Sequence, residues 1–126
     1  MKAKPFVVFA MSALLALALV ACGGGGGGGG STEAQDATVQ GLDSFQFDPA
    51  TLTAGVGQTV NVTLENAGVL EHNFVIDELN VSLGPVPGGQ SASASFTPST
   101  AGSFEYYCDV PGHREAGMVG TLTVNP

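Results

Sequence analysis

Basic side chains are almost missing from this chain of 126 residues, which has three Lys and Arg together against eleven Asp and Glu. Its formal net charge is −8 at pH 7. Proteins that bind nucleic acid need a basic face that neutralises phosphates. The composition therefore excludes nucleic acid as a natural partner. Such acidity promotes solubility, and it can also steer a basic partner.

Helix-forming patterns are also missing, and so is an apolar run long enough to span a membrane. No stretch of useful length places apolar residues at the helical period. The longest apolar run, residues 6–21, follows Lys2 and Lys4 and is too short and wrongly flanked for a membrane span. A short basic start before such a run is typical of an export signal.

The end of that run, LVAC at residues 19–22, resembles a bacterial lipobox, in which the Cys is acylated and becomes the new first residue. We expect a signal peptide over residues 1–21 and acyl chains on Cys22 that anchor the protein at the cell membrane, facing the periplasm or exterior. The alternatives are a plain secretory signal with an incidental Cys and an uncleaved anchor. Cleavage before Cys22 leaves Arg114 as the single base against eleven acids, a charge of about −10.

The stretch after Cys22 contains nothing that could form a core. Gly23 to Gly30 is an unbroken glycine run, and STEAQDA follows it. A glycine-rich coil of about fifteen residues spans roughly 20 Å. We therefore expect residues 22–37 to be a flexible tether and residues 38–126 to be the folded domain.

Within that domain, short segments rich in β-branched and aromatic residues alternate with turn segments. The predicted strands are FQFDP, TVNVTLEN, HNFVID, SASASFTP, SFEYYC and GMVGTLTV, and the turns are AGVGQ, GPVPGGQ and PSTAG. Alternation is clear at Val60, Val62 and Leu64, which face one side of their strand. The pattern predicts an all-β domain, an antiparallel β-sandwich large enough to fold alone.

Cys, His and Met are rare in this sequence, and the predicted domain contains them as one set: His72, Cys108, His113 and Met118. The other Cys lies in the lipobox, and the other two Met lie in the signal. Two imidazoles, one thiolate and a weak thioether form the donor set of a type 1, or blue, copper site. The set therefore predicts one copper ion.

The spacing of the four residues suits this chemistry. Cys108 ends one predicted strand and Met118 opens the next, both facing inward, and His113 lies in the loop between them. The Pro-Gly pair before His113 provides a sharp turn. His72 begins HNFVID and must come from another strand.

Other interpretations of these residues stay open at this point. Cys108 could be an ordinary buried thiol, or it could form a disulfide with Cys22. Either His could lie on the surface, and Met118 could simply fill core space. Zinc could also bind one Cys and two His.

The motifs CDVPGHREAGM and EHNFVID resemble those of the cupredoxins, and the two four-residue gaps, Cys to His and His to Met, most resemble the auracyanins. The resemblance covers residues 38–126. It implies an eight-stranded Greek-key sandwich. It also implies that His72, Cys108, His113 and Met118 bind copper, which carries one electron at a time.

The resemblance also suggests residues that surround the ligands. In cupredoxins the residue matching Asn73 links the two ligand segments, and its backbone N–H reaches the thiolate. Val110 keeps a backbone N–H where some relatives have Pro, so a second bond to sulfur is possible. Both bonds would favour Cu(I). Whether the carbonyl of Glu71 approaches copper stays open, and so does a role in electron entry for the outward-facing Tyr107.

We expect a membrane-tethered, monomeric electron carrier and not an enzyme. Nitrite reductases and multicopper oxidases need further copper centres built largely from His, and this chain has no spare His. If the likeness to auracyanins holds, the partners would include a c-type cytochrome and a quinol-oxidising complex or reaction centre. The alternatives are a copper-delivery or copper-storage protein and a metal-free adhesion domain.

Overall fold

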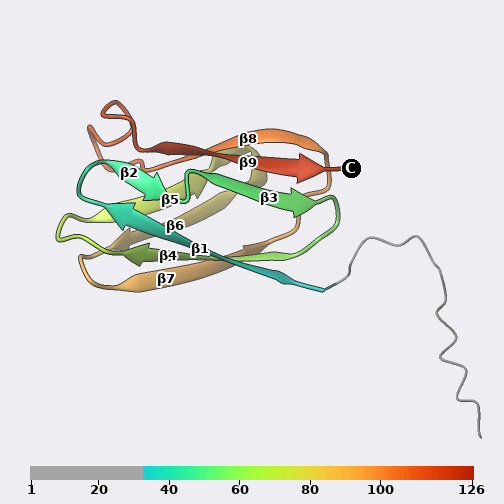
Figure 1. The fold of residues 1–126 in the computed structure, drawn as a ribbon, viewed down its shortest axis with the longest axis horizontal. Coiled ribbons are helices and arrows are strands. Elements are labelled where there is room, and N and C mark those ends of the chain that lie inside the picture. The colour runs from blue at the N-terminus through green and yellow to red at the C-terminus, as the bar shows by residue number, and fades with distance from the viewer. Residues whose placement is uncertain (1–32) are drawn as a thin grey trace, which may run out of the picture.

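The computed structural model describes residues 33–126, which form a sandwich of nine strands (Figure 1). The strands are β1 (Gln35–Leu42), β2 (Gln46–Asp48), β3 (Thr51–Gly55), β4 (Val60–Asn66), β5 (His72–Ile76), β6 (Val81–Val86), β7 (Ser91–Phe96), β8 (Gly102–Tyr107) and β9 (Val119–Asn125). A short 3-10 turn, η1 (Asp77–Leu79), joins β5 to β6. The predicted all-β sandwich is confirmed, with nine strands in place of about eight.

The predicted signal peptide, Cys22 and the glycine run lie outside the described residues. Within residues 33–126, no helix has the length and apolar character needed to span a membrane.

The strands form two sheets, in the orders β2-β1-β4-β7 and β3-β9-β8-β5-β6. Most neighbours are antiparallel, but β1 pairs with β4 and β3 pairs with β9 in parallel. The expectation of a purely antiparallel sandwich is wrong at these two pairs. Alternation along a strand predicts which side is buried, but it carries no information on the direction of the neighbouring strand.

Strand β1 begins at Gln35, whereas the sequence places the start of the domain at Thr38. Gln35 is paired with Val60 in the parallel ladder, and its N–H donates to the carbonyl of Thr59 at 2.8 Å. Backbone hydrogen bonds to β4 thus order a polar stretch that has little apolar surface of its own to bury.

The core lies between the two sheets. Val60, Val62 and Leu64 of β4 are each at most 1% exposed, as their alternation predicts. The rings of Phe74 and Tyr106 stack with centroids 4.9 Å apart. The hydroxyl of Tyr106 donates to the carbonyl of Pro49 at 2.8 Å, so the polar end of this buried ring is satisfied.

Four loops gather at the end of the sandwich opposite Pro126 (Figure 1). They join β1 to β2, β4 to β5, β6 to β7 and β8 to β9, and the last of them contains CDVPGHREAGM. Packed sheets therefore support the end of the molecule where the predicted copper ligands lie.

Candidate metal centre

Three potential metal donors converge at this end of the sandwich. One donor atom each of His72, Cys108 and His113 lies within 4.8 Å of the other two. Cys108 Sγ and His113 Nδ1 are 3.4 Å apart, and the two imidazole centroids are 5.2 Å apart. Nitrogen and sulfur donors bind one metal ion at about 2.0–2.3 Å. These separations therefore suit a single shared ion.

Met118 is held next to the same group by the backbone. The N–H of Cys108 donates to the carbonyl of Met118 at 3.1 Å, and the N–H of Met118 donates to the carbonyl of His113 at 3.0 Å. The side chain of Met118 is completely buried. The structure thus brings all four predicted donors to one place.

The loop that contains three of them is a tight turn. The N–H of His113 donates to the carbonyl of Val110 at 3.0 Å, and Gly112 has a φ of +87°, which favours glycine. Cys108 directly follows β8, and Met118 directly precedes β9. The sequence placed both ligands within the strands, but β8 ends one residue before Cys108 and β9 begins one residue after Met118.

His72 is the first residue of β5 and is completely buried. Neither ring nitrogen has a hydrogen-bond partner within residues 33–126. Buried polar atoms are normally hydrogen-bonded, so a ring nitrogen without a partner at this place indicates a missing ligand. Burial, followed by the nearby His113, lowers the pKa of His72. This favours the neutral imidazole that binds metals.

A glycine provides the space for this ring. A Cβ added to Gly41 of β1 would lie 3.0 Å from the imidazole of His72. Any larger residue at this position would crowd the ring, so β1 shapes the site although it supplies no donor.

Cys108 is the buried thiol of the site. Its Sγ accepts the N–H of Asn73 at 3.3 Å. Burial raises the pKa of the thiol, while the N–H groups of Asn73 and Val110 oppose this rise. The Asn73 contact meets hydrogen-bond geometry, and no such bond from Val110 is found in the described chain. The side-chain amide of Asn73 also donates to Asp109, which joins β5 to the Cys108 loop.

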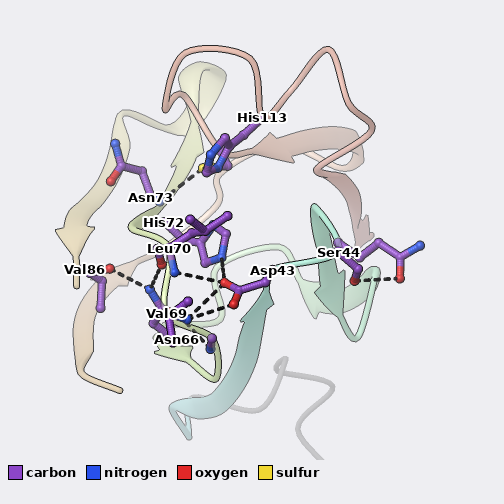
Figure 2. Close-up of polar contacts among 12 residues, drawn as sticks. Asp43, Ser44, Asn66, Val69, Leu70, His72, Asn73, Val86 and His113 are labelled. Carbon is purple, nitrogen blue, oxygen red and sulfur yellow. Dashed lines mark hydrogen bonds and ion pairs between the residues drawn. The ribbon is translucent and has the colours of Figure 1, made fainter. Parts of the chain in front are cut away.

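Three residues near the site were missed by sequence reasoning: Asp43, Phe45 and Asn66. The ring of Phe45 packs edge-on against His113, with centroids 4.9 Å apart. The buried amide of Asn66 donates to the carbonyls of Leu70 and Val86 and so orders the loop before His72 (Figure 2). Each lies in a turn or at a strand end, and none belongs to the Cys, His and Met donor set, so the sequence offers no signal for it.

The same end of the molecule exposes apolar side chains. Val69 is 84% exposed and Leu70 is 41% exposed, both in the loop before His72. His113 and Val110 are partly buried, and Pro111 is exposed. Glu71 is exposed.

Tyr106 and Tyr107 point to opposite sides of β8. Tyr106 is completely buried in the core. Tyr107 is partly buried, and its hydroxyl donates to Asp77 at 2.8 Å. The guanidinium of Arg114 lies 3.8 Å above the ring of Tyr107, so the single base of this region is held over an aromatic face.

Comparison with known proteins finds several relatives. The chain is 37% identical over 101 residues to the copper-resistant cuproprotein CopI of Rubrivivax gelatinosus, covering 65% of this chain and 61% of that protein. It is 34% identical over 110 residues to plastocyanin of Prochlorothrix hollandica, covering 72% and 76%. It is 30% identical over 113 residues to auracyanin-A of Chloroflexus aurantiacus, covering 66% and 69%. The chain thus spans about three fifths of the length of that CopI.

Solved structures agree on the fold. Reduced auracyanin from Roseiflexus castenholzii matches with a TM-score of 0.67 at 23% identity, covering 78% of this chain and all of that one. The copper nitrite reductase of Thermus scotoductus also matches, with a TM-score of 0.64 at 26% identity, but the match covers only 28% of that enzyme.

The residues present fit one type 1 copper ion. Two imidazoles, one thiolate and a thioether lie together, and His72, Cys108 and Met118 are completely buried. This is the soft, mixed donor set that suits copper in electron-transfer sites. The family model described as cupredoxin-like domain matches residues 8–124. The chain belongs to the family of cupredoxin-like proteins.

Proposed function

We propose that the protein is a blue copper electron carrier that works outside the cytoplasm. In this proposal His72, Cys108 and His113 bind one copper ion, and Met118 is its weak axial ligand. The observation that carries the proposal is the convergence of three donor atoms within 4.8 Å of one another in a largely buried site. A bound copper ion supplies the one-electron change between Cu(II) and Cu(I).

The part played by the protein is to hold the donors still. Cys108 and Met118 flank the paired residues Tyr107 and Val119, and Tyr107 also pairs with Val75 of β5, the strand that begins at His72. Strand pairing therefore links the segments that supply all four donors. A site held in this way changes shape little when its charge changes, which favours fast electron transfer.

Asn73 acts on the thiolate in this proposal. Its N–H bond to Cys108 Sγ withdraws charge from the sulfur and so favours Cu(I). Val110 has the same role to a smaller degree, since its backbone N–H opposes the rise in the pKa of the Cys108 thiol less than the N–H of Asn73 does.

The electron leaves through the end of the sandwich at His113. The exposed Val69 and Leu70, with Val110, form an apolar surface there that sheds water readily on contact. A partner can then come close without a large permanent interface, which suits a monomer that must leave quickly. The net negative charge steers a basic partner. A c-type cytochrome and a membrane quinol-oxidising complex or reaction centre are partners of this kind.

The proposed location is the outer side of the cell membrane. Acyl chains on Cys22 anchor the mature protein, and the glycine run lets the domain stand away from the lipid. The lipobox and the tether directly after it support this location.

Copper delivery or storage is the second candidate function, because the similar CopI protein is described as a copper-resistant cuproprotein. The burial of His72, Cys108 and Met118 opposes it, since metal-transfer sites need accessible donors. The two functions differ in what leaves the protein. A carrier loses an electron and keeps its metal, whereas a delivery protein loses the metal.

The test uses the purified protein and Cu(II). A carrier should bind one copper with an intense visible band, oxidise a reduced c-type cytochrome rapidly and retain Cu(I) when a Cu(I) chelator is added. Rapid loss of copper to the chelator with slow cytochrome oxidation would support delivery. A colourless copper complex would overturn both the type 1 site and the carrier function.

A further inference from the structure

An acidic side chain faces the imidazole of His72 from a different sheet. Asp43 Oδ1 lies 3.7 Å from His72 Nε2, and Figure 2 shows the carboxylate directed at the ring. This separation is longer than a hydrogen bond and within the range of an ion pair. Asp43 directly follows β1, and His72 begins β5. The contact therefore joins the two layers of the sandwich.

The carboxylate is held in place independently of His72. Its Oδ1 accepts the N–H groups of Val69 and Leu70 at 3.1 and 3.0 Å, and its Oδ2 accepts that of Val69 at 3.0 Å. These are the residues just before His72 in the chain. The loop that leads to His72 thus fixes the acid that faces it.

Glycine makes this arrangement possible. A Cβ added to Gly68 would lie 2.0 Å from Asp43 Oδ1. Gly68 lies beside the carboxylate, while Gly41 lies against the ring of His72. Two residues without side chains therefore make room for the acid and the imidazole to approach each other.

The geometry leaves one ring nitrogen for the metal. Nε2 faces Asp43, so Nδ1 is the nitrogen free to bind the ion at the centre of the donor cluster. A metal-bound His usually presents its other N–H to an acceptor, which fixes the tautomer and makes the imidazole more basic. A carboxylate does this more strongly than a neutral acceptor, because it is charged.

We propose that Asp43 is a positioning residue for the copper site: it holds His72 with Nε2 protonated and Nδ1 toward the metal, and its negative charge stabilises Cu(II) relative to Cu(I). This inference rests on the proposed copper site. Asp43 opposes Asn73, whose N–H bond to the thiolate favours Cu(I). The two contacts therefore shift the reduction potential in opposite directions: Asp43 lowers it and Asn73 raises it.

Asp43→Asn is the first test, because asparagine keeps an oxygen for the N–H groups of Val69 and Leu70 but removes the charge. In copper-loaded protein the ratio of Cu(I) to Cu(II) at a fixed potential should rise about tenfold, which for one electron is about 59 mV. Gly68→Ala should shift the ratio the same way, because it displaces the carboxylate and keeps its charge. Asp43→Glu, if it reaches Nε2, should stay nearer to wild type than Asp43→Asn.

The matched control is Asp36→Asn. Asp36 is an exposed acid near the start of β1, roughly 20 Å away at 3.3 Å per residue, and it also accepts a hydrogen bond, from Asn61. It loses the same charge but should leave the ratio within about twofold of wild type. Nitrogen NMR of the reduced wild-type protein distinguishes the positioning role from a merely structural one, because it reports on the two ring nitrogens of His72 directly. It should show Nδ1 of His72 bound to the metal and a slowly exchanging proton on Nε2, and exchange should be faster in Asp43→Asn.

The outcomes distinguish failure of the proposed copper site from failure of the role proposed for Asp43. If wild type forms no blue copper site, the proposed function fails. If wild type is blue but Asp43→Asn and Asp36→Asn shift the potential equally, or neither shifts it, the positioning role is wrong. Binding of copper through Nε2 of His72 would overturn it as well, even if Asp43→Asn failed to fold.

Discussion

Asn73 donates its backbone N–H to the sulfur of Cys108 at 3.3 Å, although the two residues are 35 positions apart. This bond joins the strand that begins at His72 to the loop that contains the other three donors. The thiolate therefore receives a hydrogen bond from the segment that supplies its partner ligand. Movement of one segment would disturb both, so the site should respond to change as one unit.

Replacement of Cys108 by serine should abolish the blue colour. Serine keeps the shape of the side chain but removes the soft sulfur donor, so any copper still bound should be pale. Visible absorption after addition of Cu(II) measures this, and far-UV circular dichroism checks that the fold is kept. An equally blue mutant would show that Cys108 is not the ligand.

Met118→Leu should leave copper bound and raise the reduction potential. A thioether donates weakly and helps Cu(II) more than Cu(I), so its loss favours the reduced form. We expect a change on the order of tenfold in the ratio of Cu(I) to Cu(II), or about 59 mV. Loss of all copper, or a lower potential, would contradict the axial role of Met118.

Leu70→Asp should slow electron transfer with a c-type cytochrome by about tenfold. The new carboxylate would lose its bound water when the partner docks and would find no opposite charge there, which costs about 1.4 kcal/mol or more. The bimolecular rate, extrapolated to high salt, measures this. Copper content should stay nearly unchanged, and the potential is measured with the rate so that a change in driving force is separated from the loss of contact. Val110→Asp should act in the same way.

Val56→Asp is the control for this surface. Val56 is 39% exposed, close to the 41% of Leu70, but its N–H bonds to Asn125 near the other end of the sandwich. The mutant gains the same charge and should keep the wild-type rate at high salt. Unchanged rates in Leu70→Asp and Val110→Asp would place electron entry elsewhere, and Tyr107 would be tested next.

The mature protein in its native host should begin at an acylated Cys22. The lipobox at residues 19–22 and the glycine run after it motivate this prediction. The mass of the first proteolytic peptide and partition into detergent measure it, and Cys22→Ser should release the protein from the membrane. An unmodified Cys22 in wild type would rule out the lipid anchor.

Asp43 should also make the metal-free domain sensitive to acid. The backbone N–H groups of Val69 and Leu70 are the main cause of the lowered pKa of Asp43, whose usual value is 3.8. A carboxyl group with a lowered folded-state pKa stabilises the fold above its unfolded pKa, and this contribution is lost as the pH falls through the folded pKa. The free energy of unfolding of wild type should therefore fall more steeply than that of Asp43→Asn below about pH 4. Parallel curves for the two would contradict the prediction.

The sequence alone determines much of this protein because its chemistry is concentrated in few residues. One Cys, one Met and two His in the domain leave a single donor set, and the loop from Cys108 to Met118 places three of the four within one turn. The alternation of Val60, Val62 and Leu64 likewise predicts a buried strand face, because side chains on a strand alternate between its two sides. These are local properties, and they can be recognised from spacing.

Only the tertiary structure decided which distant residues meet. The parallel pairing of β1 with β4 orders the chain from Gln35 onward, which its polar residues do not predict. Asp43 faces His72 across 29 positions of sequence because two sheets pack together and because Gly41 and Gly68 leave the space. An aspartate in a turn looks like any other aspartate in a sequence. Its proximity to a metal ligand arises from packing over the whole domain, which no local pattern records.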